Sequence, residues 1–238
     1  MIDLALLFFV SFVAATISGA AGFGGALLLL PILTEIVGIK SAVPILTIGQ
    51  LFGNASRVWF GRTELKWKPI TLFLLSAIPL TIIGSYLFTD FKSENIKIMI
   101  GIFLILLVIY RRLNLKKSST GNLAMLFGGG LTGFLSGLIG SAGPLGAAFF
   151  LGLNLTATAY VASEAFTALT MHIIKTIIYN KYSLVGLTEL YYGLFIGLVM
   201  ILGSWTGKKI IEKLPQKKFI LLVEILLIIS AINMIITK

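Results

Sequence analysis

The chain has 238 residues, of which 58% are hydrophobic and only 12% are charged, and its mean hydropathy is +1.03. A water-soluble fold of this length would need more charge to cover its surface, so the composition predicts an all-α integral membrane protein. The lack of cysteine excludes structural disulfides, thiolate metal sites and a cysteine nucleophile. The formal net charge of +10 is attributed to loops that meet lipid headgroups, and no nucleic-acid partner is expected.

Eight apolar stretches follow one another along the chain, and each is predicted to be helical because an open sheet cannot satisfy its backbone in lipid. They cover roughly residues 2–37, 39–60, 69–88, 96–110, 122–153, 156–179, 187–211 and 219–236. The first stretch lacks a preceding basic segment and has a counterpart later in the chain, so it is expected to stay in the mature protein. No linker is long enough to separate soluble domains, which predicts a single compact transmembrane domain.

The first and fifth stretches are each interrupted by a glycine-rich run, at residues 18–25 and 136–144. A helix that restarts inside the membrane leaves unpaired N–H groups there, and these carry roughly half a positive charge. Glycine allows close approach of the backbone to a ligand, and serine hydroxyls add donors. The two breaks therefore predict an anion-binding site. Close helix packing is the alternative, and it is the expected role of Gly129, Gly133, Gly137, Gly193 and Gly197.

The second half of the chain repeats the first. A shift of about 118 residues aligns the following pairs: Ser18 with Ser136, Gly22 with Gly140, Gly25 with Gly143, Asn54 with His172, and Arg57 with Lys175. A shift of about 119 aligns Gly84 and Ser85 with Gly203 and Ser204. Two membrane repeats are thus predicted, over residues 1–119 and 120–238.

Loop charge indicates how the two halves are oriented. If each broken stretch enters and leaves on the same face, 13 of the 19 basic residues share one side of the membrane. If each crosses the membrane twice, the better arrangement puts only 11 on one side. The positive-inside rule therefore favours inverted repeats, each starting with a re-entrant helical hairpin, with both termini outside.

Ionisable residues inside apolar spans are costly and usually face a cavity or the bundle interior. Arg57 and Lys175 occupy equivalent places, and each follows a polar residue by three positions, which puts both on one helix face. They are expected in the wall of the anion site, with snorkelling to headgroups as the alternative. Glu164 is the candidate coupling group, because burial disfavours a charged carboxylate, and a structural pair with Lys175 is its alternative. His172 alternatively serves as a hydrogen-bonding bridge between helices.

The predicted substrate-binding residues are Ser18, Gly22, Phe23, Gly24, Gly25, Gln50, Asn54, Arg57, Ser136, Gly140, Ser141, Ala142, Gly143, Thr167, His172 and Lys175. Further hydroxyl donors are available at Thr47, Ser163 and Thr170. No catalytic triad or metal-ligand spacing surrounds the lone histidine, so neither an enzyme, a cofactor nor a metal is expected.

The twin motifs resemble those of the sulfite exporter TauE/SafE family over essentially the whole chain: Ser18-Gly19-x-x-Gly22-x-Gly24-Gly25 and Ser136-Gly137-x-x-Gly140-x-x-Gly143. The resemblance implies transport of small sulfur-containing anions, such as sulfite, thiosulfate or short organosulfonates, across a prokaryotic cytoplasmic membrane. The predicted function is secondary transport of such an anion by alternating access, as an exporter. The expected partners are that anion, the bilayer and a coupling proton or sodium ion. A passive anion channel, a cation carrier, and a membrane enzyme or assembly factor that merely contains a cavity remain as alternatives.

Overall fold

The structure is a computed structural model that describes residues 4–88 and 121–215 and the isolated positions 105, 109, 217, 218, 221, 222, 224, 225, 228, 229 and 232. Every regular element in these residues is a helix: α1 Leu4–Ala21, α2 Gly25–Val37, α3 Ile39–Phe60, the short η1 Arg62–Glu64, α4 Trp67–Leu87, α6 Asn122–Ile139, α7 Gly143–Leu151, α8 Ala157–Lys181 and α9 Leu187–Ile211. The all-helical prediction is confirmed for this part of the chain. The stretches predicted at 96–110 and 219–236 lie mostly outside the described residues.

The helices have the length and surface of membrane spans. Among the described residues, α1, α4, α6, α8 and α9 are each long and apolar enough to cross a bilayer. Large apolar side chains point outward, with Leu187 87% exposed, Leu123 82% and Leu75 70%. Such a surface is stable only against acyl chains. The chain is therefore a multi-pass membrane protein.

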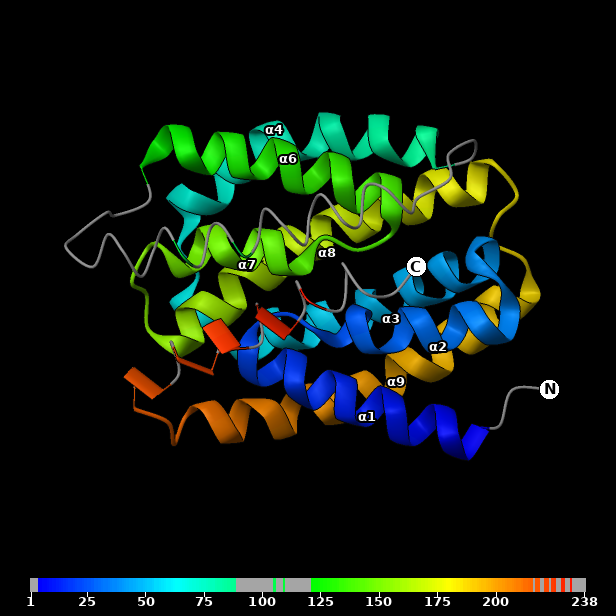
Figure 1. Cartoon of the computed structure of the whole chain (residues 1–238), viewed down its shortest axis with the longest axis horizontal. Coiled ribbons are helices and arrows are strands. Elements are labelled where there is room, and N and C mark those ends of the chain that lie inside the picture. Colours follow the sequence, from blue (N-terminus) through cyan, green and yellow to red (C-terminus); the bar gives the residue numbers. More distant parts are fainter. Residues whose placement is uncertain are drawn as a thin grey trace.

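The helices run along the long axis of the molecule in two directions (Figure 1). Helices α1, α3 and α9 run one way, whereas α4, α6 and α8 run the other way. Helices α3 and α8 pack against each other in the middle, α1 packs on α9, and α4 packs on α6. After its break, α2 leads back toward the end where α1 begins. Each half thus packs its broken helix against a helix of the other half.

Glycines allow α4 to approach α6 closely, and α9 to approach α3. A Cβ at Gly84 of α4 would lie 2.1 Å from the carbonyl oxygen of Phe134 on α6, so no other residue fits there. On α6 the Gly129, Gly133 and Gly137 positions are equally close to the α4 backbone, and on α9 a Cβ at Gly193 or Gly197 would collide with side chains of α3. These contacts confirm the packing role predicted for all five glycines.

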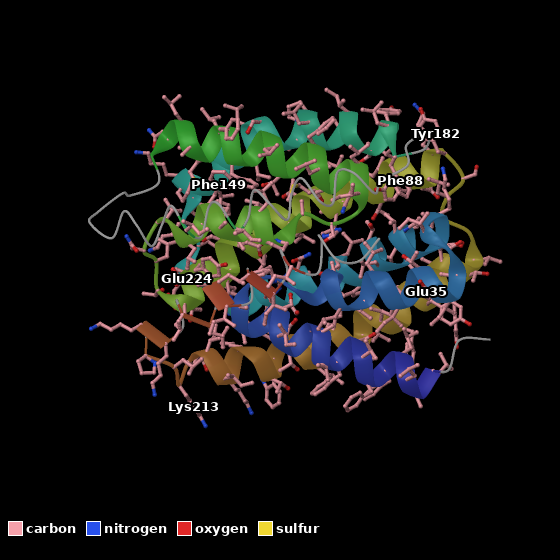
Figure 2. All side chains as sticks on the ribbon, in the orientation of Figure 1. Glu35, Phe88, Phe149, Tyr182, Lys213 and Glu224 are labelled. Carbon is pink, nitrogen blue, oxygen red and sulfur yellow. The ribbon has the colours of Figure 1, made fainter. Side chains whose placement is uncertain are left out.

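The interior of the bundle is polar where the surface is apolar. Buried serine, threonine and ionisable side chains, Arg57, Glu164 and Lys175 among them, lie on or between α1, α3, α6 and α8. In Figure 2, Lys213, which follows α9, lies at one end of the molecule, and Phe88 and Tyr182 lie at the other.

Candidate functional site

The first break separates α1 from α2 at residues 22–24. Gly22 and Gly24 have φ angles of +87° and +107°, a region that L side chains rarely adopt, which is why glycine stands at both positions. Helix α2 restarts at Gly25 without any side-chain cap on its first N–H groups. An uncapped helix start inside a membrane protein presents donors and partial positive charge to the space in front of it.

The second break separates α6 from α7 at residues 140–142. Gly140 has a φ angle of +81°, and Pro144 stands in the first turn of α7, where its missing N–H costs nothing. Helix α7 also starts without a side-chain cap. The sequence prediction of two matched helix interruptions is thereby confirmed, although only the first break uses two left-handed glycines.

The two breaks meet in the middle of the molecule. A Cβ at Gly143 would lie 3.5 Å from the Cβ of Phe23, so the two breaks lie close together. Between them is a cavity of about 40 Å³, whose wall includes both breaks and side chains of α3, α6 and α8. Since a water needs roughly 10–15 Å³ measured in this way, the cavity holds about three water-sized groups.

Arg57 stands in the cavity wall and joins α3 to the first break. Its guanidinium donates hydrogen bonds to the carbonyl oxygens of Ser18, at 3.2 Å, and Gly22, and to Oδ1 of Asn54. The Ser18 carbonyl also accepts the backbone N–H of Gly22 at 2.8 Å, whereas the Gly22 carbonyl lies in the break beyond the end of α1 and takes its hydrogen bond from Arg57. Its Nη1 also lies 3.6 Å from Oε2 of Glu164 on α8. Arg57 is 5% exposed, so snorkelling does not describe its position.

Lys175 makes the equivalent contacts in the second half. Its ammonium donates hydrogen bonds to Oγ of Ser136 at 3.2 Å and to the carbonyl oxygen of Gly140 at 2.9 Å. Each of these contacts spans the same number of residues as its counterpart at Arg57. Glu164 pairs with Arg57 and not with Lys175, contrary to the structural pair that the sequence left open.

Several buried polar atoms of the cavity wall lack a hydrogen-bond partner among the described residues. They are Nε of Arg57, Nδ2 of Asn54, Oγ1 of Thr132, Oε2 of Glu164 and Nδ1 of His172. Buried polar groups in folded proteins are almost always paired with protein, water or ligand. Donors and acceptors left open around one cavity indicate a site for a small polar species, and the cation and the two helix starts favour a negative one.

Most of the predicted site residues come together in this cavity. Its wall contains Ser18, Gly22, Phe23, Gly24, Gly25, Gln50, Asn54, Arg57, Ser136, Ser141, Ala142, Gly143, Glu164, Thr167 and His172. Gly140 and Lys175 are absent from the wall as the described residues form it. Ser163 instead accepts a hydrogen bond from the backbone N–H of Lys66, and Thr170 donates to the carbonyl oxygen of Phe166.

The wall also contains residues that the sequence did not single out: Ala26, Thr132, Gly146, Ala168 and Met171. Helical periodicity could have found some of them. Thr132 precedes Ser136 by one turn, and Ala168 follows Glu164 by one turn, so each shares a helix face with a predicted residue. The apolar members gave no chemical signal, because alanine, glycine and methionine are ordinary in any membrane helix.

Together these features define a multi-pass membrane protein with a buried polar cavity that suits a small anion. The chain belongs to the sulfite exporter TauE/SafE family, whose profile matches residues 7–234, nearly the whole length. The resemblance inferred from the twin motifs is confirmed by this match. No match was found among curated proteins or among solved structures. Membership of a transporter family makes membrane anion transport the class of function.

Proposed function

We propose that the protein is a secondary transporter that exports a small sulfur-containing anion, sulfite, thiosulfate or a short organosulfonate, across a prokaryotic cytoplasmic membrane by alternating access. The observation that carries the proposal is the cavity between the two helix breaks, which contains the buried Arg57 and several polar atoms without partners. Sulfite presents three oxygens around one sulfur. A cavity for about three water-sized groups is of the right order for such an ion.

The binding chemistry follows from the wall. Arg57 supplies a permanent positive charge with an unused Nε–H, and Asn54 supplies an amide N–H. The starts of α2 and α7 add backbone N–H groups from two directions. The hydroxyls of Thr132 and Ser141 complete a set of donors that fits an oxyanion better than a cation.

The two halves are proposed to be inverted repeats whose broken helices are re-entrant hairpins. The matched contacts of Arg57 and Lys175 support the repeat relation, because each cation reaches back to the equivalent carbonyl of its own break. The opposite directions of α3 and α8 in Figure 1 support the inversion. In transporters of this design the substrate lies near mid-membrane where the repeats meet, and the proposal assigns that place to this cavity, whose wall contains both breaks.

Glu164 is proposed to couple transport to a proton. While its carboxylate is charged, it competes with the substrate for Arg57, from which it lies 3.6 Å away. Protonation removes this competition and leaves the guanidinium available to the anion. Residue 46, the counterpart of Glu164 under the repeat shift of about 118, is a leucine, so the acid belongs to one half only.

The test is anion binding and transport by the purified protein. Sulfite, sulfate, thiosulfate and sulfoacetate are each added to the detergent-solubilised protein, and a true substrate is expected to raise the melting temperature, because a ligand stabilises the state that it binds. The double variant with Arg57→Gln and Glu164→Gln is expected to show no rise in melting temperature with any of the four anions. Glu164 is replaced together with Arg57 so that no buried carboxylate is left without its partner.

The transport arm uses proteoliposomes loaded with radiolabelled sulfite. The sulfite flux is expected to saturate as the sulfite concentration rises, and any steady current is expected to stay within the rates of a carrier. Flux that does not saturate, with large steady currents in a planar bilayer, would replace the carrier by a passive channel. Failure of all four anions to stabilise the protein or to cross the membrane would refute the proposed function.

A further inference from the structure

A second, smaller pocket of about 10 Å³ lies beside the central cavity. It lies where the ends of α3 and α9 meet the start of α8, and its wall includes Gly61, Thr158, Ser204 and Lys208. Arg57 belongs to the walls of both pockets, so its guanidinium stands between them. The pocket admits about one water, and the wall residue that it shares with the cavity is Arg57.

The equivalent place in the other half is filled by aromatic rings. Under the repeat shifts of about 118 and 119 residues, Gly61 corresponds to Tyr179 and Gly207 corresponds to Phe88. Tyr179 is fully buried, its hydroxyl donates to the carbonyl oxygen of Gly137 at 3.2 Å, and its ring centroid lies 5.3 Å from that of Phe88. Two rings at one end of the molecule thus correspond to two glycines at the other, of which Gly61 lies in the pocket wall and Gly207 packs against the backbone of α1.

The two ends are far apart along the long axis. Figure 2 places Phe88 at one end and Lys213, two residues beyond α9, at the other. Gly61 is needed where it stands, because a Cβ there would lie 2.6 Å from the Cβ of Ala162 and would narrow the space further. The difference between the ends is therefore one of side-chain volume at equivalent positions.

Lys208 places a second cation at the outer side of the narrow pocket. Its side chain is 31% exposed, and its Nζ lies 3.4 Å from Oε1 of Glu212. An anion leaving the cavity would pass from the buried guanidinium of Arg57 to the partly exposed ammonium of Lys208. Cations arranged along a narrow path raise the local concentration of anions and speed their association.

We propose that the anion moves between the central cavity and this membrane face through the second pocket, with Lys208 as its outermost binding contact, while Tyr179 and Phe88 close the equivalent route to the opposite face. This proposal rests on the proposed function and adds the route and a residue that serves it. Because the pocket now admits about one water, the ends of α3, α8 and α9 must separate for an oxyanion to pass.

The first experiment compares two neighbouring lysines. In proteoliposomes, Lys208→Gln is expected to raise the KM for radiolabelled sulfite about three- to tenfold, and the effect should shrink at high salt because screening weakens a steering charge. Lys209→Gln is the matched control, since its ammonium lies over the ring of Trp205 and outside the pocket wall. Glu212→Gln releases Lys208 from its ion pair and is expected to lower the KM. Equal KM values for the two lysine variants would overturn the role of Lys208.

The second experiment uses the lack of cysteine in the chain. Ser204 lies in the wall of the second pocket, and Ser85 is its counterpart under the repeat shift of about 119 residues; both are buried. With single variants Ser204→Cys and Ser85→Cys, an anionic thiosulfonate reagent is expected to modify the first about tenfold faster, since electrostatic steering brings anions to that end. Sulfoacetate is expected to protect Ser204→Cys, and it is used in place of sulfite because sulfite itself reacts with thiosulfonates. Equal modification rates would refute the one-sided route.

The outcomes separate the two proposals. If the unmodified protein transports sulfite but Lys208→Gln behaves as Lys209→Gln does, the route is wrong and the proposed function stands. If no anion stabilises or crosses with the unmodified protein, the proposed function fails, whatever the labelling rates are.

Discussion

The ion pair between Arg57 and Glu164 gives the sharpest test of how the cavity is held together. The two charges lie 3.6 Å apart, and each side chain is 4% exposed. At an effective dielectric constant of about 20 their attraction is ~5 kcal/mol, and the cost of desolvating both groups offsets much of it. Removing only the cation leaves a carboxylate buried without a partner. We therefore expect Arg57→Gln to destabilise the protein by about 3–5 kcal/mol.

A double-mutant cycle separates the charge from the rest of the arginine. Glu164→Gln alone is expected to cost less than Arg57→Gln, because the guanidinium keeps its hydrogen bonds to Ser18, Gly22 and Asn54. The double variant should recover about 1–3 kcal/mol relative to Arg57→Gln, since no buried charge remains unpaired. It should not recover fully, because the carbonyl oxygen of Gly22 and Oδ1 of Asn54 lose the hydrogen bonds that Arg57 donates.

Thermal unfolding of the four proteins in one detergent measures the cycle, with near-ultraviolet circular dichroism to confirm that each is folded at the start. A double variant no more stable than Arg57→Gln would show that the 3.6 Å contact carries no coupling, and the electrostatic account of the cavity would be refuted.

Three further predictions concern the coupling group, the helix contacts and the second cation. Thiosulfate is expected to bind more tightly to Glu164→Gln than to the unmodified protein, because a neutral amide does not compete for the guanidinium as the carboxylate does, and calorimetry measures both Kd values. Gly84→Ala should destabilise the protein by about 1–3 kcal/mol, because the added Cβ would lie 2.1 Å from a carbonyl oxygen of α6, whereas Gly121→Ala has open space and should melt like the unmodified protein. Lys175→Gln should lower the melting temperature, because Gly140 and Ser136 lose a buried hydrogen-bond donor. The Kd of the folded variant for thiosulfate should stay within about twofold of that of the unmodified protein. A large rise in Kd would place Lys175 in the site.

Much of the secondary structure followed from local pattern. Helix α3 occupies residues 39–60 and α9 occupies residues 187–211, as predicted, because glycine and charged residues bound both apolar stretches. The breaks were also visible, since no residue other than glycine adopts the positive φ angles found at Gly22 and Gly140 without strain. The orientation of the repeats in a bilayer and the re-entrant depth of the broken helices remain predictions.

The sequence alone determined that this is a helical membrane protein with two matched interruptions, and it identified most residues of the cavity, because composition, periodicity and glycine placement are local properties. Only the tertiary structure decided that Glu164 pairs with Arg57 and that Lys175 lies outside the cavity wall. These outcomes depend on how α3 and α8 pack together, and a rotation of about 100° about either helix axis, the step of one residue, would change which side chains face each other. The sequence already shows two aromatic residues in one half where the other half has two glycines. Only the packing of the helix ends shows that the rings of Tyr179 and Phe88 lie side by side.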